Sequence, residues 1–173
     1  MFNKINTMKR LISVALISTI LVFTNCNKAS DPFIHINCDG LITDTTGSGN
    51  IARIYMPNAF SPNNDGLNEI CRPVTQNIDS IVFTVYDENN SVVFTTNVLG
   101  QGWQPATGGI TAKKYYYKIQ TVTAAGKKIG KCGEVYSLTC FTVNPTRSFY
   151  YFEDMLTPNG FTGVTNESLP TCP

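Results

Sequence analysis

Residues Pro57–Glu69, PNAFSPNNDGLNE, are the stretch of this 173-residue chain that says most about its fold. An apolar pair, Ala59-Phe60, lies near its start, and proline, asparagine, glycine and acidic residues follow. Pro62 fixes its own backbone φ, Asp65-Gly66 permits a positive φ, and asparagine side chains readily bond the local backbone. We therefore predict that a short buried run ends here in a tight turn.

The same residues allow a second interpretation, in which the turn is a calcium-binding loop. Asn63, Asp65 and Glu69 carry the hard oxygen donors that calcium prefers, and Gly66 permits a sharp bend among them. The spacing N-x-D-G-x-x-E partly matches calcium loops of the D-x-D-x-D-G kind. Two carboxylates supply little charge for a strong site, so we favour the turn and keep a calcium site as the alternative.

Around this turn, short apolar runs alternate with clusters of turn residues. Strands are expected at Ile34–Cys38, Ile51–Met56, Ile81–Tyr86, Ser91–Thr96, Tyr115–Thr123 and Lys128–Val143, the last of them broken near Gly133. Apolar residues keep no 3.6-residue period after the N-terminal region, so the pattern does not favour helices. The regular turn signals instead predict an all-β fold, an Ig-like antiparallel β-sandwich of about seven strands.

The N-terminal region has the pattern of an export signal. A basic group, Met8-Lys9-Arg10, precedes the apolar run Leu11–Phe23, which is short for a membrane span and fits a signal-peptide core. Cys26 follows closely, and the residues before it resemble the lipobox of bacterial lipoproteins, with Asn25 in place of the usual Gly or Ala. We expect residues 1–26 to be a lipoprotein signal peptide and Cys26 to be lipidated. The alternative is a secretory signal cleaved nearby, and in both cases the chain leaves the cytoplasm.

The remaining cysteines also indicate an oxidising compartment. They are Cys38, Cys71, Cys132, Cys140 and Cys172. With Cys26 lipidated, these five allow two disulfides and one free thiol, in arrangements that the sequence does not separate. Cys132 and Cys140 lie eight residues apart in one expected strand, which places them about 26 Å apart at about 3.3 Å per residue. That distance excludes a bond between them, so each is expected to pair with another element.

Several segments together resemble the CHU_C family, the gliding-motility-associated C-terminal domains of Bacteroidetes surface proteins. Ile54–Glu69, IYMPNAFSPNNDGLNE, is similar to the opening signature of that family, and Ile81–Thr96, IVFTVYDENNSVVFTT, to its next hairpin. Gly102-Trp103 resembles the G-W-D that follows, and Tyr115–Ile119 the Y-x-Y-x-I strand near the end. The resemblance covers roughly residues 51–140 and implies the family's β-sandwich fold.

The family's usual role, as implied by the resemblance, is that of a C-terminal sorting signal for the type IX secretion system, attached to a large cargo. Here the signature lies near the middle of the chain, which continues past Cys140 to Pro173. We therefore expect the fold to carry over more fully than the sorting role. The expected organisation is a signal peptide (1–26), a tether and first strand (27–50), a CHU_C-like β-sandwich (51–143) and an irregular C-terminal extension packed on it (144–173).

Few other residues suggest a chemical site. Trp103 could be a platform for a sugar ring, but a lone tryptophan after glycine in a sandwich more often packs, which we favour. His35 is the single histidine and lies beside the tether, so neither a catalytic triad nor a zinc site is expected. Lys127, Lys128 and Lys131 are interpreted as a solvated turn, and the net charge of +1 gives no case for nucleic-acid binding.

The sequence therefore predicts a non-enzymatic lipoprotein of the cell envelope, anchored by lipid on the outer membrane of a Bacteroidetes bacterium and facing the cell surface. Its expected role is structural or adhesive, through contacts with an envelope protein or a glycan. Two alternatives remain open. The first is a sorting or machinery-associated module of type IX secretion and gliding. The second is a carbohydrate-binding lipoprotein that uses Trp103.

Overall fold

A computed structural model describes residues 38, 41, 51–105, 113–141 and 150–172. In these ranges the chain forms strands and a single three-residue 3-10 helix, which confirms the predicted all-β class. The strands are β1 (Arg53–Tyr55), β2 (Ala59–Phe60), β3 (Val74–Gln76), β4 (Ile78–Tyr86), β5 (Val92–Thr96), β6 (Lys113–Thr123), β7 (Lys128–Ser137), β8 (Leu156–Thr157) and β9 (Gly160–Phe161), and the helix is η1 (Glu153–Met155).

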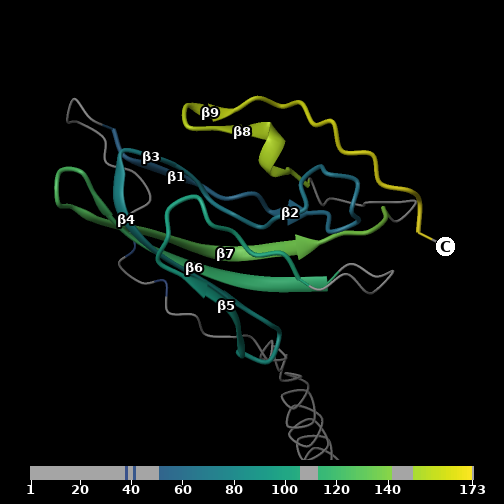
Figure 1. The fold of residues 1–173 in the computed structure, drawn as a ribbon, viewed down its shortest axis with the longest axis horizontal. Helices are drawn as coiled ribbons and strands as arrows, with labels where there is room; N and C mark the ends of the chain where they lie inside the picture. Colours follow the sequence, from purple (N-terminus) through teal and green to yellow (C-terminus); the bar gives the residue numbers. More distant parts are fainter. Residues whose placement is uncertain (1–37, 39–40, 42–50, 106–112, 142–149, 173) are drawn as a thin grey trace, which may run out of the picture. The chain divides into compact units, whose positions relative to one another are not determined.

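The largest layer is a five-stranded sheet with the order β2-β7-β6-β4-β5 (Figure 1). Strands β4 to β7 pair in antiparallel fashion, as expected for the sandwich, whereas the two-residue strand β2 pairs with β7 in parallel. The β4–β5 turn is closed by Asp87, whose Oδ1 accepts hydrogen bonds from the backbone N–H groups of Asn89 (2.8 Å) and Ser91 (2.9 Å). A short side chain that bonds its own turn therefore sets the register of this hairpin.

Strand β7 differs from the expectation that it breaks near Gly133. It continues without interruption to Ser137, and Gly133 pairs with Tyr117 of β6. A Cβ atom at Gly133 would lie 3.0 Å from the Tyr117 hydroxyl, so glycine here makes room for a ring instead of ending the strand.

A second layer, the ribbon of β1 and β3, covers the inner face of the sheet and completes the sandwich. Side chains alternate along the strands, so Ile81, Phe83 and Val85 of β4 point inward. They meet Ile54 and Met56 from the opposite layer in one apolar core. Burial of each such side chain stabilises the fold by about 1.5–3 kcal/mol.

Residues 150–172 pack against the sandwich from the side of the ribbon, and we call them the C-terminal strap (Figure 1). The strap holds η1 and the small hairpin β8–β9, so this part is less irregular than expected. Phe152 and Met155 are buried in a second apolar cluster with Ala59 of β2 and Leu138, which follows β7. Backbone bonds from Asn58 and Ala59 to the carbonyl of residue 151 continue this contact.

Two disulfides tie the described residues together, Cys38–Cys132 and Cys140–Cys172, and Cys71 is a buried free thiol. This is one of the arrangements of two disulfides and one free thiol that the five cysteines allow, and Cys132 and Cys140 are each paired with another element, as predicted. The predicted signal peptide, the lipidation site Cys26, and the tether with His35 lie outside the described residues. Cys38 is described and is not in a strand. Within the described ranges, no helix has the length and apolar character needed to cross a bilayer.

The three lysines that were interpreted as a solvated turn separate in the structure. Lys127 and Lys128 are exposed at the β6–β7 turn, whereas Lys131 is half-buried. The interpretation of Lys131 is thus wrong, because strand alternation turns its side chain toward the covered face of the sheet.

Candidate functional site

Within the stretch Pro57–Glu69, residues 61–69 form a closed loop after β2, as predicted for a turn. The Ser61 N–H donates to the Asn68 carbonyl at 2.8 Å, which brings the two ends of the loop together. Asn64, Gly66 and Asn68 adopt positive φ angles of 66°, 88° and 48°. Glycine and asparagine tolerate this left-handed region better than other residues, which explains why the loop is rich in them.

The three side chains proposed as calcium ligands are all used to fold this loop. Oδ1 of Asn63 accepts the Asp65 N–H at 3.1 Å, and Oδ1 of Asp65 accepts the Leu67 N–H at 2.8 Å. Oε1 of Glu69 accepts the Gly66 N–H at 3.2 Å. Among the described residues, no group of three or more His, Cys, Asp or Glu side chains is arranged to hold a metal. Calcium at Asn63, Asp65 and Glu69 stays a prediction, which melting with and without a chelator tests.

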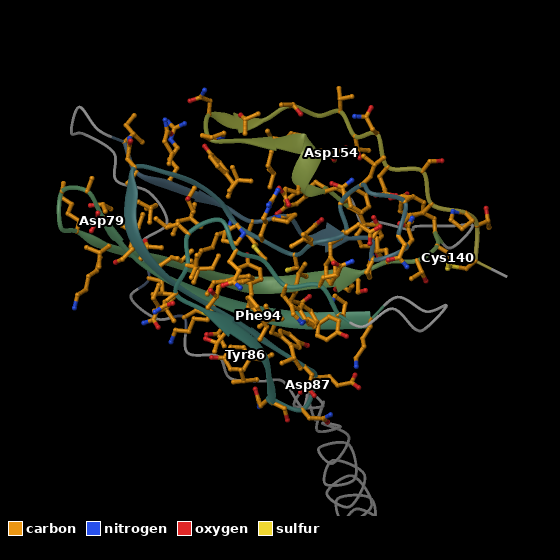
Figure 2. All side chains as sticks on the ribbon, viewed as in Figure 1. Asp79, Tyr86, Asp87, Phe94, Cys140 and Asp154 are labelled. Atoms are coloured by element: carbon orange, nitrogen blue, oxygen red, sulfur yellow. A yellow bond between two sulfur atoms is a disulfide. The ribbon has the colours of Figure 1, made fainter. Side chains whose placement is uncertain are left out.

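The C-terminal strap binds polar side chains of the stretch Pro57–Glu69, on both sides of β2. The side-chain carbonyl of Asn58 accepts the Tyr151 N–H at 2.7 Å, and that of Asn68 accepts the Asp154 N–H at 3.1 Å. These two asparagine side chains thus bind the backbone of the strap. Figure 2 shows Asp154 on the short helix η1, where the strap begins to cross the loop.

Glu167 is the second anchor of the strap. Its Oε2 accepts hydrogen bonds from the fully buried hydroxyl of Ser61 and from Nδ2 of Asn68 at 3.1 Å. Its other oxygen, Oε1, is buried and accepts no hydrogen bond from the residues that the structure describes. The Glu167 carboxylate therefore enters the loop, and only one of its two oxygens accepts hydrogen bonds there. No local sequence pattern connects Glu167 with Ser61 and Asn68.

An ion pair and a cleft complete the contact between loop and strap. Arg72 donates through Nε and Nη2 to Oε1 of Glu153, at 2.7 and 2.6 Å. Burial, and to a lesser extent the negative charge of Glu153, raises the pKa of the neighbouring Cys71 thiol, which therefore stays protonated. A cleft of about 540 Å³ remains between the two segments, with Asn64, Gln104 and Asp154 among its lining residues.

The end of the strap is fixed beside the end of β7. The backbone of Phe141 accepts the Cys172 N–H and donates to the Pro170 carbonyl, both at 2.7 Å. The disulfide Cys140–Cys172 closes the same contact, and Figure 2 shows Cys140 beyond the end of β7. The strap is therefore held at η1, at Glu167 and at its disulfide.

Trp103 lies beside this site with its ring in an aromatic cluster. Its backbone exchanges two hydrogen bonds with Cys71, at 2.8 and 2.9 Å. Its ring centroid lies 4.7 Å from that of Tyr115 and 5.8 Å from that of Phe60. Gly102 permits this approach, because a Cβ atom there would lie 2.5 Å from Cβ of Arg72. The contacts support the packing role, and the sugar platform stays a prediction.

Sequence reasoning thus located the loop but missed its partners. Glu153 and Glu167 bind residues about 80 to 106 positions away, and neither stands in a recognisable motif. One signal in the sequence could have indicated a partner. Asn58, Ser61 and Asn68 carry more hydrogen-bonding groups than a simple turn uses.

Comparison with known proteins agrees with the resemblance found in the sequence. Residues 54–136 match the family model described as the CHU_C Type IX secretion signal domain. No curated protein and no solved structure matches the chain. The match associates the chain with type IX secretion and with the cell envelope or surface.

Proposed function

Because residues 54–136 match the family model of the CHU_C Type IX secretion signal domain, we propose that the chain is a non-enzymatic protein of the cell envelope. In this proposal Cys26 carries a lipid that anchors the chain in the outer membrane, with the sandwich at the surface of a Bacteroidetes cell. The domain has a structural or adhesive role there, through contacts with another envelope protein or a glycan.

The observation that carries this proposal is the strap across the family signature. A sorting signal acts by presenting its side chains to another protein. Here Asn58, Ser61 and Asn68 of the signature already bind the strap. Because these side chains are bound within the domain, they are not available to a sorting partner. This favours a domain that stays in the envelope over one whose signature is recognised during export.

The proposed anchor rests on the leader and on the oxidised cysteines. Two disulfides in the described residues fit an extracytoplasmic protein. Two acyl chains on one cysteine are sufficient for stable attachment to a membrane, whereas a single chain is marginal. A lipidated Cys26 would therefore hold the sandwich at the membrane without a spanning segment.

Fractionation of cells that express Cys26→Ser tests the anchor. The variant is expected to leave the membrane fraction and to lose the shift in gel mobility that the lipid causes. Asn25→Gly is the matched control, because it restores the residue usual before a lipobox cysteine and should keep the protein bound. Membrane attachment of Cys26→Ser with unchanged mobility would show that the lipid anchor is wrong.

The family match itself favours a second candidate, a sorting or machinery-associated module of type IX secretion. Residues 51–173 fused to a periplasmic reporter separate the two candidates. Under the first proposal the reporter stays in the periplasm of a type IX-competent host. Export in that host, and retention in a secretion mutant, would favour the second candidate.

A further inference from the structure

Lys131 occupies a core position of the main sheet. The pairing of β4, β6 and β7 aligns Phe83, Ile119 and Lys131 side by side, and residues in such register share one face of a sheet. Phe83 and Ile119 are both fully buried in the core between the two layers. The lysine stem therefore points to the interior, and burial lowers the pKa of its ammonium group.

A pocket opens over Lys131 at the place where sheet, ribbon and strap meet. Its volume is about 330 Å³, and it is lined by Tyr55, Met56, Lys131, Tyr151, Leu156 and Phe161. Every lining residue except Lys131 has an apolar or aromatic body. Volumes near the lower end of about 300–1,000 Å³ are typical of sites for small ligands, which combine apolar walls with few polar groups.

Among the described residues, the charge that lines this pocket is positive and has no acidic partner. No carboxylate is among the lining residues, and the ion pairs of the described chain involve Arg72 and Lys114 and not Lys131. A second cation stands nearby, because Nη1 of Arg53 lies 3.3 Å from the Tyr55 hydroxyl. A half-buried ammonium without a counter-ion is costly, and a bound anion would offset that cost.

We propose that this pocket binds a small carboxylic acid with an aromatic or branched apolar body. The carboxylate pairs with the Lys131 ammonium, and the body packs against Tyr55, Met56 and Tyr151. The rim is formed by Phe161, which is 52% exposed and makes an edge contact with Tyr151 at 6.0 Å. The site shares Tyr55 and Met56 with the signature but does not include the loop of residues 61–69 that binds the strap, and it does not depend on the proposed function.

The inward position of Lys131 has a competing explanation, in which the lysine prevents another chain from pairing with the edge of the sheet. Strand β2 pairs with β7 only at Tyr136 and Ser137, so within the described residues the rest of this β7 edge has no strand beside it. Inward-pointing charges on edge strands hinder pairing with another chain. In that case Lys131 would have no preference for a ligand, and its loss would lead to association of copies.

Methyl NMR of the full chain separates these explanations. With ¹³C-labelled methionine methyl groups, Met56 reports on the pocket, and Met155, which lies in the other apolar cluster, serves as internal control. Titration with phenylacetate is expected to shift the Met56 signal saturably and to leave Met155 in place. Phenylacetamide has the same shape without the charge and is expected to bind about tenfold more weakly, since a charge-assisted hydrogen bond is lost.

Three variants complete the experiment. Lys131→Gln is expected to bind acid and amide equally weakly, whereas Lys131→Arg keeps the charge and the preference for the acid. Lys128→Gln, an exposed position on the same strand, should behave as the wild type. Equal binding of acid and amide by the wild type, or an undiminished preference in Lys131→Gln, overturns the proposal. Association of Lys131→Gln copies, with no phenylacetate binding by the wild type, would assign the residue to edge protection instead.

Discussion

The five-stranded sheet and the C-terminal strap differ in how much side-chain surface they bury. The sheet supplies most of the main core, through large apolar residues such as Phe83, Ile119 and Val135. The strap fully buries Phe152 and Met155, and its other contacts include hydrogen bonds to Asn58 and Asn68, an ion pair and a disulfide. Regions with few buried apolar contacts open locally at lower free energy than the core. The strap should therefore open from the signature while the sandwich stays folded.

The largest effect is expected from a cavity in the sheet. Phe83 is fully buried and makes an edge contact with Phe94 at 5.8 Å. Phe83→Ala should lower the global free energy of unfolding by about 3–5 kcal/mol, as measured by denaturant titration. Phe152→Ala is the matched change in the strap and should cost clearly less in the same titration, because the strap can open alone. Equal losses for both variants would mean that strap and sheet unfold as one unit.

Strand β4 shows how far a sequence pattern reaches in such a sheet. Alternation of Ile81, Phe83 and Val85 predicts the strand and its inner face. The strand begins earlier, at Ile78, and its register shifts between Ile78 and Ser80, where the polar pair Asp79-Ser80 interrupts the pattern. A pattern of period two identifies a face but not a bulge, because the extra residue reverses the alternation.

The strap and β2 show what the sequence does not reveal. Strand β2 is only two residues long, and its parallel pairing with β7 depends on where the loop after it returns. The contacts of Glu167 join positions 99 and 106 residues apart, and no local rule connects them. The same limit applies to Lys131, whose place on the core face follows only from its pairing with Ile119.

The disulfide Cys140–Cys172 should have the second largest effect. It links residues 32 positions apart. In the chain-entropy account, removal of a disulfide that closes a loop of this size lowers the free energy of unfolding by about 3–4 kcal/mol. In the double variant Cys140→Ser/Cys172→Ser, this loss should appear mainly as faster hydrogen exchange of the Tyr151 and Asp154 N–H groups. Exchange of the N–H groups of β6 is the internal control and should change much less. A uniform acceleration across strap and sheet would contradict independent opening.

A smaller effect is expected when only the charge of Glu167 is removed. Glu167→Gln keeps the size of the side chain but weakens the bonds from Ser61 and Asn68, which should cost about 1.5 kcal/mol. Exchange at Asp154 should then increase, since Asn68 also holds that N–H. Glu88→Gln, an exposed residue of the β4–β5 turn, is the control and should leave exchange in the strap unchanged. An unaltered exchange rate in Glu167→Gln would show that the backbone bonds and the disulfide hold the strap without this carboxylate.

The smallest effect concerns the sheet itself and depends on pH. The backbone N–H of Ser91, followed by that of Asn89, bonds the Asp87 carboxylate and lowers its pKa in the folded state. A carboxyl group with a lowered folded pKa stabilises the fold fully above its unfolded pKa of about 3.9. That contribution is lost as the pH falls through the lower folded value, because the proton removes the charge that the N–H groups bind. Asp87→Asn keeps an acceptor without titrating, so between pH 5 and pH 2 its stability, measured by thermal melting, should fall less than that of the wild type. Parallel acid profiles for the two proteins would mean that the turn holds its register without the charge, and that burial alone stabilises this end of the sheet.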